Sequence, residues 1–338
     1  MSALLEVRDL EVRFRAKSPL RALVDPERQV WLDAVAGVSF SLAEGQTLGL
    51  VGESGSGKTT LARAIIGLVP PAGGSIRFKG EEIAGLSGRA MKAVRRDMTM
   101  MFQDPAGSLS PRLTVRALIT EPFRIHRLAG RDLDAEARRL LRLVGLPADF
   151  ADRYPHQLSG GQARRIGVAR ALALEPRLIL ADEPTAGLDV SVQGEVLNLL
   201  ARLQDEMGLA ILMVTHNLNV VRHVTDRVAI MYLGRFVETG PTDAIFAQPR
   251  HPYTAALLSA NPEPDPDARL NRIELAGDIP SLVDRPPGCE FHTRCFRVQP
   301  TCRDTAPEAT HDDGRRFTCH FPLSDFDGLD RAHHRRRG

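Results

Sequence analysis

The stretch Gly52-Glu-Ser-Gly-Ser-Gly57-Lys58-Thr59 decides the fold. It fits the phosphate-loop pattern of Gly, four residues, Gly, Lys and then Ser or Thr. The apolar residues 47–51 before it predict a buried strand, and residues 60–68 after it predict a helix. Backbone N–H groups of the loop and of the helix N-terminus would then converge on one phosphate. Because strand, loop and helix coincide with the motif, a chance Gly/Ser loop is the weaker interpretation.

Two side chains carry the chemistry of this loop. Lys58 would reach the β- and γ-phosphates as a compact charge, and Thr59 would offer its hydroxyl to Mg²⁺. Lysine occurs only at positions 17, 58, 79 and 92, whereas arginine supplies the other 40 of the 44 basic residues, so a planar guanidinium is not expected to fit here. The predicted nucleotide-binding residues of the loop are Gly52, Ser54, Gly55, Ser56, Gly57, Lys58, Thr59 and Thr60.

A phosphate loop needs a second metal anchor at the end of a neighbouring strand. Residues 178–181 are apolar and are followed by Asp182 and Glu183. Asp182 is the predicted second Mg²⁺ anchor, and Glu183 would orient or deprotonate the attacking water. An ordinary acidic pair at a strand end is the alternative, and the lysine-bearing loop weighs against it.

Composition excludes several classes of protein. The chain has 338 residues, enough for about two domains, with 43% hydrophobic residues and 44 basic against 42 acidic side chains. This balance does not indicate disorder or a nucleic-acid partner. No apolar run approaches the roughly 20 residues that cross a bilayer, and the N-terminus lacks a secretory signal. We therefore expect a cytoplasmic chain.

Short apolar segments alternate with helical patterns and predict an α/β fold with a mostly parallel sheet. Two helices are marked by apolar stripes. One lies within a helical insertion between residues 104 and 175 and stops at Gly145, and the other runs from Asp189 or Ser191 to Gly208. From Asn261 onward we expect a separate, loop-rich tail. Strands are expected at residues 4–10, 35–42, 47–51, 75–78, 98–102, 178–181, 210–215 and 228–232.

The segment Leu158-Ser159-Gly160-Gly161-Gln162 lies between the loop and the acidic pair. Ser159 and the glycines would begin a helix that runs through Arg170, so N–H donors there suit a second anion. Only one phosphate loop in the chain carries a lysine, however. A plain helix cap is the alternative, and the flanking residues 154–157 and 164–172 weigh against it.

With this segment the chain resembles the ATP-binding-cassette ATPases, and over residues 1 to about 260 its motifs follow that family's order. The resemblance implies a P-loop NTPase core with an antiparallel β subdomain and the helical insertion, binding ATP and Mg²⁺ and hydrolysing the ATP. Phe14 matches the aromatic that stacks on adenine. Gln103 matches the glutamine that joins the metal site to the helical subdomain, and His216 the switch histidine at the γ-phosphate.

The family assembles as a dimer, and the resemblance extends to that contact. In the family, the segment matched by Ser159, Gly160, Gly161 and Gln162 faces the γ-phosphate bound to the opposing subunit, and Asp189 matches the dimer-contact aspartate. Two cassettes thereby sandwich two ATP molecules. The sequence differs from the usual motifs of the family in two places. Ala186-Gly-Leu-Asp189 replaces the frequent Ser-Ala-Leu-Asp, and Arg164 stands where glutamine is usual.

Residues 101–112, 154–162 and 251–266 narrow the resemblance to the F-type ATPases of oligopeptide and dipeptide importers. This implies a cassette over 1–260 and an importer-type extension over 261–338. The implied partners are a paralogous D-type ATPase or a second copy, two transmembrane permeases and, indirectly, a peptide-binding protein. Such a subunit lies peripherally on the cytoplasmic face of the inner membrane. The alternatives are transport of nickel, glutathione or an opine-like solute, and a non-transport cassette.

All four cysteines lie in the tail, at Cys289, Cys295, Cys302 and Cys319. In a reducing compartment, four thiols in about 30 loop-rich residues indicate a metal rather than two disulfides. Spacing alone leaves Zn²⁺ and an iron–sulfur cluster open. The resemblance implies a [4Fe–4S] cluster, His292 and His320 keep a mixed zinc site open, and unliganded buried cysteines are the remaining alternative.

Overall fold

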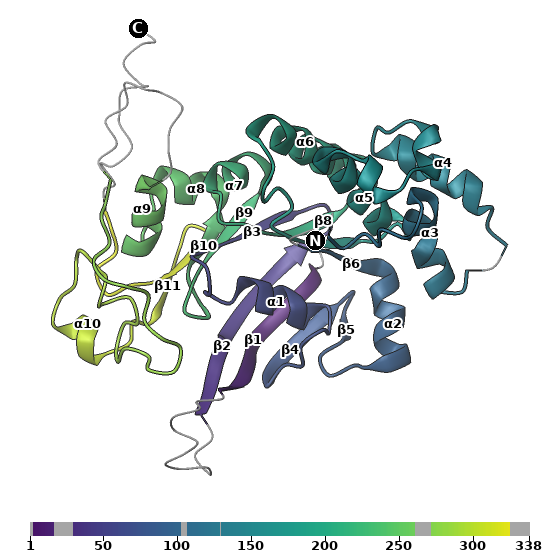
Figure 1. Ribbon diagram of the computed structural model, residues 1–338. Helices are drawn as coiled ribbons and strands as arrows, with labels where there is room; N and C mark the ends of the chain where they lie inside the picture. The colour runs from purple at the N-terminus through teal and green to yellow at the C-terminus, as the bar shows by residue number, and fades with distance from the viewer. Residues whose placement is uncertain (1–2, 17–29, 103–106, 129, 261–271, 325–338) are drawn as a thin grey trace, which may run out of the picture.

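Two β-sheets organise the chain in the computed structural model, which describes residues 3–16, 30–102, 107–128, 130–260 and 272–324 (Figure 1). One sheet has the order β2-β1-β4-β5 and the other β11-β12-β10-β9-β3-β8-β7-β6. The strands are β1 (Ala3–Ala16), β2 (Val30–Ala43), β3 (Thr47–Val51), β4 (Gly73–Phe78), β5 (Glu81–Glu82), β6 (Met98–Met101), β7 (Leu178–Asp182), β8 (Ala210–Val214), β9 (Arg227–Tyr232), β10 (Arg235–Pro241), β11 (Ala309–Asp312) and β12 (Arg315–Thr318).

Helices cover the sheets and fill the segment between β6 and β7. They are α1 (Lys58–Ile65), α2 (Gly88–Asp97), α3 (Val115–Ile125), α4 (Leu133–Leu143), α5 (Gly160–Leu172), α6 (Val190–Met207), α7 (Leu218–Val224), α8 (Thr242–Ala247), α9 (Pro252–Ser259) and α10 (Thr301–Asp304), with 3₁₀ turns at Ala148–Asp152 and Pro155–Gln157. None of the helices within the described ranges is both long enough and apolar enough to cross a membrane.

The strand pairing confirms the expected mixed architecture. β9, β3, β8, β7 and β6 run parallel to one another, β10 is antiparallel to β9, and the smaller sheet is antiparallel throughout. All eight predicted strands are present. The hairpin of β1 and β2 extends beyond the predicted bounds, because cross-strand pairing continues to Ala16 and Val30 and is joined by an ion pair of 2.7 Å between Arg13 and Asp33.

Both helices predicted from apolar stripes are present. α4 carries its buried residues Ala137, Leu140 and Leu141 on one face and is followed by Gly145 at φ 70°. α6 begins after Asp189, whose side chain accepts a hydrogen bond from the Val192 N–H at 2.9 Å, and ends at Gly208 in the left-handed conformation. A side-chain N-cap and a left-handed terminator therefore set the ends of α6, as the sequence predicts.

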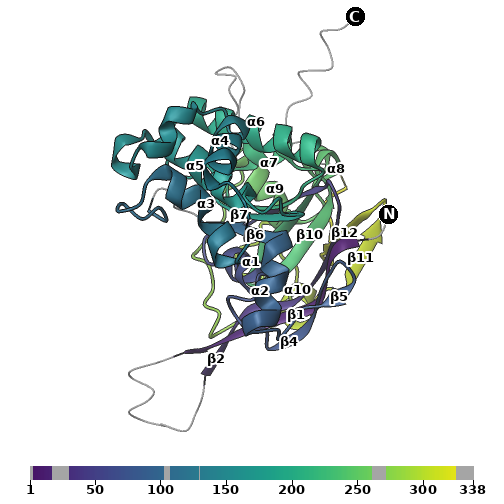
Figure 2. The same cartoon turned by 90° about the vertical axis from the view of Figure 1, so that its right-hand side faces the viewer.

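The tail does not stand apart from the cassette. β12 pairs with β10, so the hairpin of β11 and β12 extends the main sheet. In Figure 2 this hairpin lies on the side of the sheets opposite α3, α4 and α5. The expectation of a separate tail is wrong in this respect, because the backbone groups at the edge of β10 are paired with tail residues. The expected boundary after residue 260 stays a prediction, because residues 261–271 lie outside the described residues.

Three hydrophobic clusters hold these layers together. One joins α3, α4, α5 and α6 to one side of the main sheet, and a second fills the space between the two sheets around α1. The third packs α8 and α9 against β9 and β10 and includes Phe291 of the tail, which is 2% exposed. The tail thus contributes a large side chain to the core of the cassette.

Candidate nucleotide-binding site

The phosphate loop joins β3, whose five residues are all buried, to α1. A Cβ atom on Gly52 would lie 2.2 Å from the Met231 carbonyl oxygen, and one on Gly57, at φ 105°, would lie 2.2 Å from the Ala34 carbonyl oxygen. No side chain fits at either position. Ser54 and Gly55 are exposed at the mouth of the loop, whereas Ser56 is buried. Thr60 lies in the first turn of α1.

Lys58 is folded into its own loop. Its Nζ atom donates to the carbonyl oxygens of Gly52 and Glu53, both at 2.8 Å, and to Ser56 Oγ at 3.2 Å. The side chain is 7% exposed, and burial lowers the pKa of the ammonium while the carboxylates of Glu183, Asp182 and Glu53 act in the opposite direction. A compact positive charge is therefore held where the loop would receive a phosphate.

Thr59 and Asp182 are in contact although they are 123 positions apart in the sequence. The Thr59 hydroxyl donates to Asp182 Oδ1 at 3.0 Å, and Asp182 is 2% exposed at the end of β7. Burial raises the pKa of the Asp182 carboxyl, and the nearby Glu183 carboxylate raises it further. A hydroxyl and a carboxylate in contact form the hard-oxygen donor set that Mg²⁺ binds, so these residues fit the expected metal.

Glu183 and His216 form the second predicted pair. Glu183 Oε1 lies 2.9 Å from His216 Nδ1, and the Glu183 side chain is 19% exposed against 67% for His216. The backbone of Glu183 has φ 48°, a left-handed value that few residues other than glycine adopt, and its N–H donates to the Val214 carbonyl at 2.8 Å. The backbone is therefore strained at the residue whose carboxylate contacts His216.

Phe14 lies on β1 opposite Leu32 and is 40% exposed. The strand it pairs with, β2, passes directly beside the phosphate loop, as the close approach of Ala34 to Gly57 shows. A base that stacks on this ring would lie on the same side of the molecule as the loop. The assignment of Phe14 to adenine stays a prediction.

The signature segment caps α5. Ser159 Oγ accepts from the Gln162 N–H at 3.3 Å, and Gln162 Oε1 accepts from the Ser159 N–H at 3.0 Å, which makes a capping box. Ser159 and Gly160 are exposed, and Gly161 passes Val192 so closely that a Cβ would lie 2.8 Å from it. In Figure 1, α5 lies beside α6 and apart from α1. The hydrogen bonds between Ser159 and Gln162 show that the signature segment acts as the N-cap of α5. A contact between this segment and a nucleotide stays a prediction.

Arg164 has a role that the sequence did not reveal. Its guanidinium is buried and donates to the carbonyl oxygens of Pro184 and Ala186, with a longer contact of 3.5 Å to that of Glu183. The signature helix is thereby tied to the backbone that follows Glu183. Asp189, which follows this backbone segment and precedes α6, is exposed, and its neighbour Val190 is 86% exposed. Gln103 lies outside the described residues, so its predicted role is not tested.

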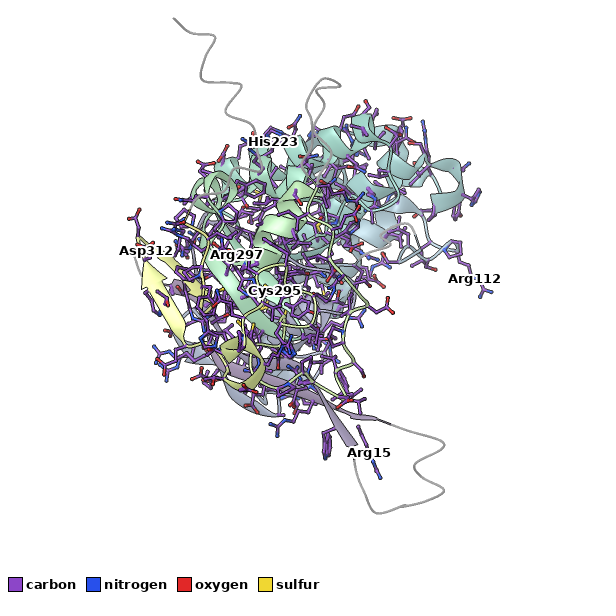
Figure 3. The ribbon with its side chains drawn as sticks, turned by 90° about the vertical axis from the view of Figure 1, so that its left-hand side faces the viewer. Arg15, Arg112, His223, Cys295, Arg297 and Asp312 are labelled. Carbon is purple, nitrogen blue, oxygen red and sulfur yellow. The ribbon has the colours of Figure 1, made fainter. Side chains whose placement is uncertain are left out.

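The four cysteines of the tail line one small cavity together with Phe291, His292 and His320. Burial raises the pKa of the Cys289 thiol to about 11 and that of Cys319 to about 12. Figure 3 places Cys295 beside Arg297 on the tail, away from Asp312. In the part of the chain that the structure describes, no group of three or more His, Cys, Asp or Glu side chains is spaced to hold a metal ion. The predicted metal centre gains no support from that spacing.

Taken together, these side chains form our candidate nucleotide-hydrolysis site. The loop would offer N–H donors and Lys58 to phosphate, Thr59 and Asp182 would offer oxygens to Mg²⁺, and Glu183 would serve as a base oriented by His216. In the structure Thr59 contacts Asp182, Glu183 contacts His216, and the carboxylates of Asp182 and Glu183 act on Lys58, while the roles of these five residues stay proposals.

Comparisons with known proteins agree with this geometry. Residues 35–186 match the family described as ABC transporter, and residues 237–302 match the family described as Oligopeptide/dipeptide transporter, C-terminal region. The chain is 47% identical over 308 residues to the oligopeptide transport ATP-binding protein OppF of Escherichia coli (strain K12), covering 90% of this chain and 92% of that protein. It is also 47% identical to the oligopeptide transport ATP-binding protein AppF of Bacillus subtilis (strain 168), covering 90% and 93%.

Solved structures give the same fold. A dimeric ATP-binding cassette in a post-hydrolysis state, bound to ADP and Pi, superposes with a TM-score of 0.61 at 28% identity. The superposition covers 70% of this chain and 98% of that one. The part of the chain that matches is thus a complete cassette, and the remainder is additional to it.

Proposed function

The chain belongs to the ABC transporter ATP-binding family, in the branch with the oligopeptide/dipeptide transporter C-terminal region, and from that membership we propose that it powers peptide import through membrane permeases. It is an ABC ATPase. The observation that carries the chemistry is the pair of contacts beside Lys58, from Thr59 to Asp182 at 3.0 Å and from Glu183 to His216 at 2.9 Å.

Each residue has a separate task in hydrolysis. Lys58 and the loop N–H groups hold the phosphates, and Thr59 and Asp182 would hold Mg²⁺, which neutralises phosphate charge. Glu183 accepts a proton from water while the water oxygen bonds to the γ-phosphorus and the bond to the ADP oxygen breaks. His216 keeps the Glu183 carboxylate oriented. Arg164 links these events to the signature helix through the backbone after Glu183.

We further propose that the cassette works as a dimer on the cytoplasmic face of the inner membrane, with a paralogous D-type ATPase or a second copy. Exposed Ser159, Gly160 and Asp189 would face the partner's nucleotide. The permeases would dock on the helical insertion, the subdomain of about residues 104–175. A groove there is lined by Phe102, Ile125 and Arg170, and the first two side chains are 40% and 52% exposed. A peptide-binding protein would act through the permeases.

Substitution of Ile125 by Asp tests the docking proposal. A charge placed in this groove should weaken copurification with two co-expressed permeases by about tenfold or more, because a central apolar anchor of an interface is lost. ATP binding by the isolated chain should not change. Val283→Asp on the tail is the matched control, since Val283 is also exposed, at 45%. Intact assembly with Ile125→Asp would place the permease contact elsewhere.

The cargo is tested in proteoliposomes that contain the full complex. We expect ATPase activity to rise on addition of the binding protein loaded with oligopeptides or dipeptides. Stimulation only by a nickel-, glutathione- or opine-loaded binding protein would replace peptide import with that alternative. Failure to associate with any permease would favour a non-transport cassette.

We also propose that the tail binds an iron–sulfur cluster, with Zn²⁺ as the alternative. Its support is that Cys289, Cys295, Cys302 and Cys319 all line one cavity. In such a cluster each of the four cysteines would bind a different iron. The cluster would hold the loops of the tail together.

Metal analysis of the anaerobically purified chain tests this proposal. We expect roughly four irons and four acid-labile sulfides per chain, as a [4Fe–4S] cluster requires. Cys302→Ser should lose most of the iron, because Cys302 is a buried member of the set. His292→Ala is the control and should retain it. Zinc in place of iron, lost in both variants, would establish a mixed zinc site, and metal-free protein would leave four unliganded thiols.

A further inference from the structure

The tail makes a direct contact with the phosphate loop. Arg294 donates from its two terminal nitrogens to the two carboxylate oxygens of Glu53, at 2.7 and 3.0 Å. The Arg294 side chain is 7% exposed and that of Glu53 26%. A two-pronged pair of this kind fixes the relative orientation of both groups as well as their separation.

Glu53 transmits this contact to the lysine of the loop. Its carbonyl oxygen accepts from Lys58 Nζ at 2.8 Å, and its N–H donates to the Tyr253 hydroxyl at 3.0 Å. One residue is thus held at its side chain by the tail, at its N–H by α9 and at its carbonyl by Lys58. A rotation of Glu53 would move an acceptor that positions the Lys58 ammonium.

The tail in turn fixes Arg294. The Arg294 N–H donates to the Phe291 carbonyl at 3.0 Å, and the Phe291 ring lies 5.3 Å from those of both Tyr232 and Tyr253. Phe291 also lines the cysteine cavity, and Cys295 is the residue after Arg294. Figure 3 shows Cys295 within this part of the tail. The conformation of the segment that carries Phe291 and Cys295 therefore sets the position of the Arg294 guanidinium.

We propose that Arg294 is a positioning residue of the phosphate loop, and that the tail sets the nucleotide affinity of the cassette through the contact between Arg294 and Glu53. This deepens the nucleotide-binding part of the proposed function. ADP binding to the isolated full-length chain tests it, so failure to assemble with permeases would not affect the result.

Arg294→Gln and Glu53→Gln should each weaken ADP binding by roughly 3- to 30-fold, the range of mutations that act through a neighbouring residue. The double variant should be no weaker than either single variant, because the two residues act as one unit. Arg294→Lys keeps the positive charge but loses the two-pronged hydrogen bond of the guanidinium. Its ADP affinity should therefore lie between that of Arg294→Gln and that of the unaltered chain. Calorimetric titration with ADP measures all four.

Asp312→Asn is the matched control. It removes an ion pair of 3.1 Å between Arg250 and the tail hairpin, which fastens the tail without contact to the phosphate loop. We expect a lower thermal midpoint and unchanged ADP affinity. ADP affinity within twofold of the unaltered chain in Glu53→Gln and Arg294→Gln would overturn the proposal, as would an equal loss in Asp312→Asn. If Arg294→Gln does not fold, Glu53→Gln and Arg294→Lys decide the question.

Discussion

Glu183→Gln should bind ATP as tightly as the unaltered chain and lose roughly 10²- to 10⁴-fold of its turnover, the usual contribution of a positioned general base. The amide has nearly the same shape as the carboxylate but does not accept a proton from water. Because the substitution leaves Lys58 and the loop untouched, the nucleotide remains bound and the dimer that it bridges should accumulate. Turnover is measured as phosphate release, and the dimer by size-exclusion chromatography with ATP.

The geometry around Glu183 makes this expectation specific. Its carboxylate lies 2.9 Å from His216 Nδ1, and its backbone is held at φ 48° by the hydrogen bond to Val214. His216→Ala should therefore lower turnover less than Glu183→Gln, since it removes the orienting contact and keeps the base. Glu206→Gln, on the exposed face of α6, is the control, and its turnover should equal that of the unaltered chain. Normal turnover in Glu183→Gln would show that another group accepts the proton.

The sequence was most informative where the site is contiguous. Eight adjacent residues, 52–59, carry most of the phosphate-binding chemistry, and their strand and helix were predictable because the motif requires both. The ends of α6 were predictable for a similar reason, since Asp189 as a cap and Gly208 as a terminator act within one turn of the backbone. Asp182 and Glu183 were predictable from the apolar strand that they end, whereas His216 was placed by the family resemblance. The structure brings Glu183 and His216 into contact.

Contacts between remote segments could not be predicted in this way. Arg294 and Glu53 are 241 positions apart, and neither belongs to a motif that requires the other. Arg164 was recognised as a departure from the family, but its carbonyl partners follow from the packing of α5 on the segment after Asp182. The tail strands were missed because β11 and β12 are only four residues each, and they are held by pairing with each other and, for β12, with β10.

Lys58→Arg should weaken ATP and ADP binding by about 10- to 150-fold, although the positive charge is kept. This range corresponds to losing a hydrogen bond to a charged group. The Lys58 ammonium is enclosed by three acceptors, the carbonyl oxygens of Gly52 and Glu53 and the hydroxyl of Ser56, and is 7% exposed. A planar guanidinium is larger and presents its donors in a fixed fork, which does not match three acceptors converging on one point.

A matched exchange elsewhere in the chain separates shape from charge. Lys79 is half exposed and pairs with Asp97 at 2.7 Å, so Lys79→Arg should leave both nucleotide binding and stability unchanged. If Lys58→Arg bound ADP as tightly as Lys79→Arg does, the shape of the cation would not matter in the loop. The scarcity of lysine, four residues against 40 arginines, would then have no bearing on the site. If Lys58→Arg instead loses ADP affinity as expected, this arginine-rich chain requires an ammonium at position 58, because the loop closes around a point charge.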